Sequence, residues 1–145
     1  MTQTLQIVCP HCDAVNRLPA ARLPDRPTCG ACKHALFTAE PVAVDEARFR
    51  KHLRASSIPL LVDFWASWCG PCRMMSPAFA AAARDLEPGV RLLKISTEEA
   101  PALARDLSIQ SIPTLALFRD GREVARQAGV IPTSRILDWT RSALG

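Results

Sequence analysis

Six cysteines, arranged as three Cys-x-x-Cys pairs, are the residues of this 145-residue chain best suited to chemistry. One pair, Cys69 and Cys72, encloses Gly70-Pro71 and follows the strongly apolar run 58–65. The run predicts a buried strand, after which the cysteines open a helix whose first turn Gly70-Pro71 bends and stiffens. A thiol at a helix N-terminus ionises readily, because the helix dipole and the free backbone amides favour an anion. The spacing therefore predicts a reversible dithiol with Cys69 as the nucleophile.

The dithiol and its flanking residues resemble the active site of the thioredoxin family. Trp68-Cys69-Gly70-Pro71-Cys72 comes after a strand with the sequence Val62-Asp63-Phe64-Trp65. The resemblance covers roughly residues 41–145 and implies the thioredoxin fold, an α/β fold whose mixed central sheet has helices on both faces. It also implies a protein-disulfide reductase that thioredoxin reductase re-reduces with electrons from NADPH. The strand-then-helix context disfavours the alternative of a structural disulfide or an idle buried pair.

The other four cysteines form two pairs separated by sixteen residues: Cys9, Cys12, Cys29 and Cys32. This spacing is typical of a structural zinc site, in which two knuckles supply four thiolates and leave no open position. The sequence Cys-Pro-His-Cys at Cys9 also occurs in strongly oxidising disulfide oxidoreductases. We favour zinc, because no long apolar strand precedes Cys9, and Pro19 and Pro24 interrupt any longer helix after it. His11 and His34 are alternative ligands, but four cysteines already satisfy the metal, so we expect both on the surface.

The four-cysteine segment is expected to form a small module, residues 1–40, ahead of a thioredoxin domain at residues 41–145. Residues 1–40 contain too few large apolar side chains to build a self-sufficient core, and metal binding must therefore supply the folding energy. The whole arrangement resembles the zinc-containing second type of bacterial thioredoxin, with one structural zinc per chain and no bound flavin or nicotinamide. A rival hypothesis is a redox-gated binding or chaperone-like module, in which oxidation expels zinc and exposes a surface.

Asp63 is an acid in an otherwise apolar strand. Burial should raise its pKa, and its position beneath the dithiol would let it take the proton of Cys72 through water. The resemblance implies the same role for this aspartate. Lys94 matches the family's lysine near the aspartate, where a cation would temper the shift; the alternative is an ordinary exposed lysine on a strand.

The sequence Ile112-Pro113-Thr114 resembles the family's cis-proline loop, which lies opposite the dithiol. The resemblance implies that the backbone of Ile112 pairs with an extended segment of the substrate. It further implies an apolar rim formed by Trp68, Gly70-Pro71, Ile112 and Gly129. The residues Pro132-Thr133, which follow this glycine, are less typical of the family.

Hydrophobic periodicity and turn residues predict the order βαβαββα, with an added helix before the final hairpin. An aspartate at position 45 is a suitable cap for the first helix, and Asp120-Gly121 predicts a tight hairpin turn. The expected strands are 41–44, 60–65, 90–95, 114–118 and 122–127, and the expected helices are 45–56, 69–86 with a kink at Pro77, 98–107, and one from about 133.

Charge distribution and hydropathy argue against nucleic-acid and membrane partners. The net charge of +4 is not concentrated in a nucleic-acid footprint, and the densest basic set, Arg48, Arg50, Lys51 and Arg54, is typical of the solvated face of one helix. No stretch approaches the ~20 apolar residues of a membrane span, and the N-terminus lacks a signal-peptide pattern. We therefore expect a soluble, monomeric, cytoplasmic protein without nucleic-acid or membrane partners, whose clients are cytosolic proteins with reducible disulfides, such as reductases and peroxidases.

Overall fold

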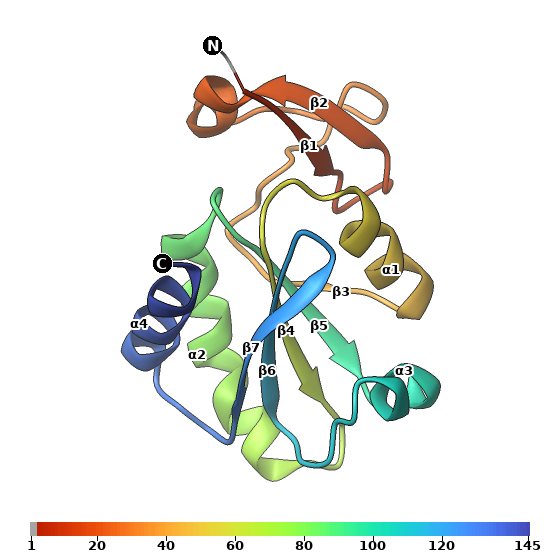
Figure 1. Cartoon of the computed structure of the whole chain (residues 1–145), viewed down its shortest axis with the longest axis vertical. Coiled ribbons are helices and arrows are strands. Elements are labelled where there is room, and N and C mark those ends of the chain that lie inside the picture. Colours follow the sequence, from red (N-terminus) through yellow and green to blue (C-terminus); the bar gives the residue numbers. More distant parts are fainter. Residues whose placement is uncertain (1–2) are drawn as a thin grey trace.

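The computed structural model describes residues 3–145 and contains two β-sheets (Figure 1). Near the N-terminus, β1 (Thr4–Val8) and β2 (Val15–Pro19) form an antiparallel hairpin, which the short 3-10 helix η1 (Ala20–Asp25) follows. A small apolar cluster beneath this hairpin contains Leu5, Ile7 and Leu36 together with two of the cysteines. In the part of the chain described, no helix has the length and apolar character needed to cross a membrane.

The larger sheet has five strands in the order β3-β5-β4-β6-β7. Its central strand β4 (Leu60–Trp65) is the apolar run that the sequence predicts to be buried. It pairs in parallel with β5 (Arg91–Ser96), which pairs in parallel with the short edge strand β3 (Val42–Ala43). On its other side, β4 pairs antiparallel with β6 (Thr114–Arg119), which forms a hairpin with β7 (Arg122–Ala128). The sheet is therefore mixed, as predicted.

Four helices cover both faces of this sheet (Figure 1). Helices α2 (Gly70–Leu86) and α4 (Thr133–Leu144) pack on one face, and α1 (Glu46–Ala55) and α3 (Pro101–Asp106) pack on the other. Because side chains alternate along a strand, Leu61 joins the core under α2, whereas Val62 and Phe64 join the core on the opposite face. This architecture confirms the predicted fold class.

Local signals explain most helix and turn boundaries. The Asp45 side chain accepts a hydrogen bond from the Arg48 amide, as expected for a helix cap. Asp120 and Gly121 both have positive φ, as a two-residue hairpin turn requires. The helix predicted from residue 98 instead begins at Pro101, because a proline disfavours the helical conformation in the residue before it, and Ala100 has φ −128° and ψ 59°.

A buried arginine connects the N-terminal hairpin with the larger sheet. Arg91 is 1% exposed, and its guanidinium donates to the backbone carbonyls of Val8 at 3.2 Å and Leu36 at 2.7 Å. It also pairs with the Glu87 carboxylate at 3.4 Å and lies over the ring of Phe37. Burial raises the pKa of Glu87 and lowers that of Arg91, while their mutual attraction opposes both shifts.

A second contact between the two parts corrects a sequence prediction. Arg48, which the sequence places on a solvated helix face, donates from Nε to both carboxylate oxygens of Asp13 at 3.0 and 3.1 Å. Its Nη2 also donates to the carbonyl of Pro10 at 2.9 Å. The prediction was wrong for Arg48 because its partners lie 35 and 38 residues away along the chain, where helix periodicity carries no information. Arg50 likewise pairs with Glu46 and with Asp106 of α3.

Candidate active site and metal centre

Cys69 caps the N-terminus of α2, where the sequence predicts it, and is joined to Cys72 by a disulfide. The Cys72 amide donates a hydrogen bond to the Cys69 sulfur at 3.2 Å. Both cysteines are nearly buried, at 4% and 3% exposure. A sulfur that receives a backbone amide at a helix N-terminus is stabilised as an anion, so this geometry suits Cys69 to be a thiolate in the reduced form.

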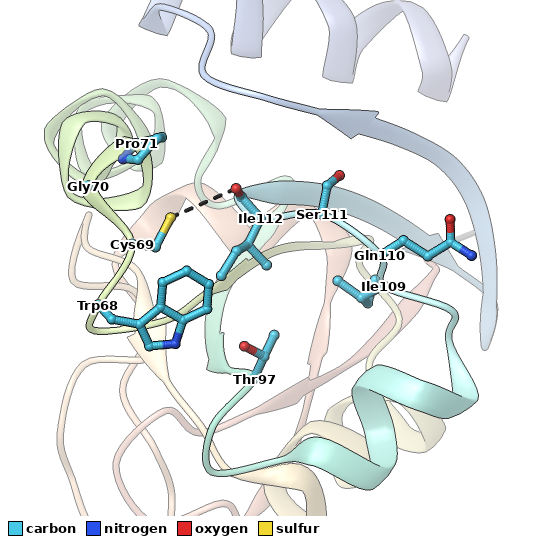
Figure 2. Close-up of a pocket in the computed structure, with 9 residues that line it drawn as sticks. All are labelled: Trp68, Cys69, Gly70, Pro71, Thr97, Ile109, Gln110, Ser111 and Ile112. Carbon is cyan, nitrogen blue, oxygen red and sulfur yellow. Dashed lines mark hydrogen bonds between the residues drawn. The ribbon is translucent and has the colours of Figure 1, made fainter.

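A groove of about 510 Å³ opens beside Cys69. Figure 2 shows the Cys69 sulfur directed at the carbonyl oxygen of Ile112, 3.8 Å away, with the ring of Trp68 alongside. Trp68 is 69% exposed, so a large apolar surface faces solvent next to the disulfide. The groove is lined by residues of the α2 start and of two loops: Trp68, Cys69, Gly70, Pro71, Thr97, Ile109, Gln110, Ser111 and Ile112.

The loop opposite the disulfide contains a cis peptide bond between Ile112 and Pro113. Pro113 is buried behind the groove, and its carbonyl accepts the amide of Gly129 at 2.9 Å. Gly129 has φ +93°, a conformation that side chains disfavour, so a glycine suits this position. Pro113 and Gly129 thus support the loop and do not line the groove itself.

Asp63 is fully buried in β4, and neither of its carboxylate oxygens has a hydrogen-bond partner among the residues described. Burial raises its pKa to about 6, and the positive charge of Lys94 acts in the opposite direction. Lys94 is the register partner of Asp63 on β5 and is half-buried, so it is not an ordinary exposed lysine. Its Nζ lies 3.1 Å from the hydroxyl of Ser76.

The four N-terminal cysteines converge on one point. Their sulfurs all lie within 4.8 Å of one another, with Cys9–Cys32 and Cys12–Cys29 each 3.6 Å apart. A tetrahedral zinc ion with Zn–S bonds of ~2.3 Å requires sulfurs about 3.8 Å apart, so the cluster fits this metal. Hydrogen bonds from the backbone of Cys32 and then from Asn16 lower the pKa of Cys29, whereas the pKa values of Cys12 and Cys32 are raised, because neighbouring thiols do not all ionise without a cation between them. A bound metal ion would supply that cation.

The two knuckles repeat the same backbone pattern. In each, the residue after the second cysteine, Asp13 or Lys33, has positive φ and donates its amide to the carbonyl of the first cysteine, Cys9 or Cys29. In each, the sulfur of that first cysteine also accepts a backbone amide from within its pair. Outside the cluster, the exposed rings of His11 and His34 stack on each other with centroids 3.7 Å apart.

Sequence reasoning missed part of this site. Thr97, Ile109, Gln110 and Ser111 line the groove without any motif that identifies them individually. For Gln110-Ser111, adjacency to the Ile112-Pro113 loop was the one available signal. Ser76 gave no signal at all, because its partner Lys94 belongs to a different element.

Comparison with known proteins identifies the class. The family model described as Thioredoxin matches residues 40–142, and the model described as Thioredoxin 2, N-terminal matches residues 8–34. The chain belongs to the thioredoxin family, whose members are thiol-disulfide oxidoreductases. Its N-terminal module is a zinc ribbon, so within that family it matches the zinc-containing type, thioredoxin 2.

Individual relatives agree with this assignment. The chain is 43% identical over 133 residues to thioredoxin C-3 of Corynebacterium nephridii, an alignment that covers 92% of this chain and 91% of the relative. It is 44% identical to thioredoxin 1 of Synechococcus elongatus over 65% of this chain and 88% of the relative. Among solved structures, a mutant thioredoxin from Halobacterium salinarum superposes with a TM-score of 0.67 at 29% identity, over 75% of this chain and 95% of the other.

Proposed function

We propose that this protein reduces disulfides of cytoplasmic client proteins and that thioredoxin reductase restores its dithiol with electrons from NADPH. The observation that carries the proposal is the Cys69 sulfur, which accepts the Cys72 amide at a helix N-terminus and borders a groove open to solvent. We expect the protein to act as a monomer, with no nucleic-acid or membrane partner.

In the first step, the Cys69 thiolate attacks one sulfur of the client disulfide. A bond forms between Cys69 and that sulfur, the client disulfide breaks, and the other client sulfur leaves as a thiolate. The hydrogen bond from the Cys72 amide lowers the cost of keeping Cys69 ionised before the attack.

In the second step, Cys72 resolves the mixed disulfide. Asp63 takes the proton of the Cys72 thiol through water, and the resulting thiolate attacks Cys69. The Cys69–client bond breaks, the second client sulfur leaves as a thiolate, and the Cys69–Cys72 disulfide remains. Support for Asp63 as the base comes from its unpartnered buried carboxylate and its pKa of about 6, which keeps it largely ionised at neutral pH.

The groove would orient the client for both steps. We propose that the Ile112 backbone pairs with an extended client segment and that Trp68 covers it, with Gly70 and Pro71 completing the apolar rim. The Ile112 carbonyl, 3.8 Å from the Cys69 sulfur, lies where such a segment would bring its disulfide into line. Pro113 and Gly129 would contribute by holding the loop in place.

For the N-terminal module, we propose one structural zinc per chain, held by Cys9, Cys12, Cys29 and Cys32, which supplies folding energy to a module that modulates the reductase without taking part in its chemistry. We further propose that residues 1–40 and 41–145 are the two units, and that the chain itself binds neither flavin nor nicotinamide. The alternative of a redox-gated chaperone-like module predicts activity that appears only after zinc loss. Turnover of a protein disulfide with reductase and NADPH, before and after chelation, separates the two.

The roles of the two active-site cysteines can be tested by exchanging each for serine. Cys69→Ser should abolish reduction, because no nucleophile remains, whereas Cys72→Ser should trap Cys69 in a mixed disulfide that mass spectrometry detects. When the reduced protein is labelled with iodoacetamide at increasing pH, Cys69 should be alkylated first, and the midpoint of its alkylation should lie at a pH below the pKa of ~8.5 of a free thiol. Trapping on Cys72, or preferential alkylation of Cys72, would contradict the assignment.

A further inference from the structure

Ser76 makes the polar contact that anchors Lys94. Its hydroxyl, on α2, lies 3.1 Å from Lys94 Nζ on β5, and both residues are half-buried. The ammonium also lies 5.1 Å from the centroid of the Trp65 ring and acts on the buried charge of Asp63. Within residues 3–145, the Ser76 hydroxyl is its one hydrogen-bond partner, so this hydroxyl gives the cation a defined position.

The residues of the resolving step share one face of the sheet with this contact. Asp63 and Lys94 are paired in register on adjacent parallel strands, so their side chains point to the same side. Ser76 follows Cys72 by four residues on α2, so both lie on the helix face that covers that side. The base, its neighbouring cation, the hydroxyl and the resolving cysteine are thus brought together by three different elements.

The Lys94 side chain also borders a pocket into which its ammonium could move. It lines this pocket of about 370 Å³ together with Ser76, Ala80 and Arg84 and the linker residues 38–41 that lead out of the zinc ribbon. Glu40 of this linker is exposed, and its carboxylate would attract the ammonium. The charged groups around Lys94 are therefore Asp63 on the sheet side, and Arg84 and Glu40 on the pocket side.

We propose that Ser76 is a positioning residue for the resolving step: it holds the Lys94 ammonium near Asp63 and away from the pocket where Glu40 competes for it. The inference rests on the function proposed for Asp63 as the base that takes the Cys72 proton. Without the hydroxyl, the ammonium moves toward the pocket. Asp63 then loses its neighbouring positive charge and binds a proton more tightly, so less of it is ionised near pH 6.

The first test is a carboxyl ¹³C titration of Asp63 in the oxidised protein, where the wild-type midpoint is expected at about 6. Ser76→Ala should raise the pH midpoint of the Asp63 titration by about 0.5 to 1 pH unit, and Lys94→Met should raise it by about 1 pH unit or more. The double variant should match Lys94→Met, because both changes remove the same interaction. Adding Glu40→Gln to Ser76→Ala should return part of the shift. Ser134→Ala, an exposed serine of α4, is the matched control and should change nothing.

Alanine favours helices, so Ser76→Ala should fold; Ser76→Thr, which keeps a hydroxyl, should retain the wild-type midpoint. An unchanged midpoint in Ser76→Ala, or full additivity with Lys94→Met, would overturn the proposal.

The second test measures release of client from the mixed disulfide as a function of pH. Ser76→Ala should slow release about threefold at pH 6 and hardly at all at pH 8, since the effect is on the ionised fraction of Asp63. If the ¹³C midpoint shifts while Asp63→Asn releases client normally, the positioning of Lys94 is correct and the role proposed for Asp63 is wrong. If Asp63→Asn releases client slowly but Ser76→Ala has the wild-type pH profile, the role proposed for Asp63 is correct and the positioning role of Ser76 is wrong.

Discussion

Replacing Arg91 by methionine tests how the zinc ribbon is held on the larger sheet. The change leaves the Glu87 carboxylate buried without its partner, with 5% of its side chain exposed, and it removes the donor to two backbone carbonyls. Breaking a buried ion pair from one side costs about 3–5 kcal/mol. The two carbonyls belong to Val8, directly before Cys9, and Leu36, four residues after Cys32, so the chain on both sides of the cysteine cluster should loosen.

The assay is the rate at which zinc passes to a colorimetric chelator, with urea unfolding of the same samples. If the interface opens before zinc leaves, a loss of about 3 kcal/mol speeds release by roughly a hundredfold. Arg141→Met, an exposed arginine of α4, is the matched control and should behave as wild type. Adding Glu87→Gln to Arg91→Met should recover part of the loss, because no buried charge then lacks a partner, while the amide oxygen can still accept from Ala39.

Equal release rates and equal urea midpoints for Arg91→Met and wild type would refute this reasoning. They would mean that the ribbon holds its metal without help from the larger sheet. That result would agree with the independent module that the sequence predicts for residues 1–40, and it would make the buried contact energetically neutral.

Four further outcomes are expected. Asp63→Asn should raise the free energy of unfolding in urea by up to ~3 kcal/mol at pH 8 and leave it unchanged at pH 4. The reason is that burial raises the pKa of Asp63 in the folded protein to about 6, so ionising this carboxyl costs stability as pH rises from about 4 to 6. The buried His52 changes the unfolding free energy with pH in the opposite direction, because burial and then the charge of Arg91 lower its pKa to about 4. Protonation of His52 therefore costs stability as pH falls from about 6.5 to 4, and His52→Leu should flatten the pH dependence of the unfolding free energy in that window. Metal analysis should find one zinc per chain in wild type and in Cys69→Ser, and none in Cys29→Ser; zinc loss in Cys69→Ser would contradict the assignment. A chain starting near residue 41 should fold, as judged by circular dichroism, and reduce a protein disulfide within about tenfold of the full chain, or ~1.4 kcal/mol in barrier; a folded but inactive product would contradict it.

Several features of the fold and site follow from short stretches of sequence. The cysteine at a helix start, the aspartate cap at residue 45 and the Asp120-Gly121 turn each depend on residues within one turn of one another, so their chemistry can be predicted without the fold. The same holds for the two zinc knuckles, whose hydrogen bonds close within five residues. Burial of Asp63 also follows locally, because the rest of the strand Leu60–Trp65 is apolar, and a continuous apolar run is typical of a strand buried on both faces.

Other features depend on which distant residues the packing brings together. Arg91 has the sequence context of an ordinary basic residue at a strand start, yet it is buried because it donates to a carbonyl 83 residues away. Ser76 acquires a partner because α2 crosses β5, and Thr97 reaches the groove because the loop after β5 ends beside the cysteines. Periodicity and spacing describe one element at a time. The neighbours of a side chain across elements are set by sheet order and helix packing, so only the tertiary structure decides which cation, hydroxyl or carbonyl each residue meets.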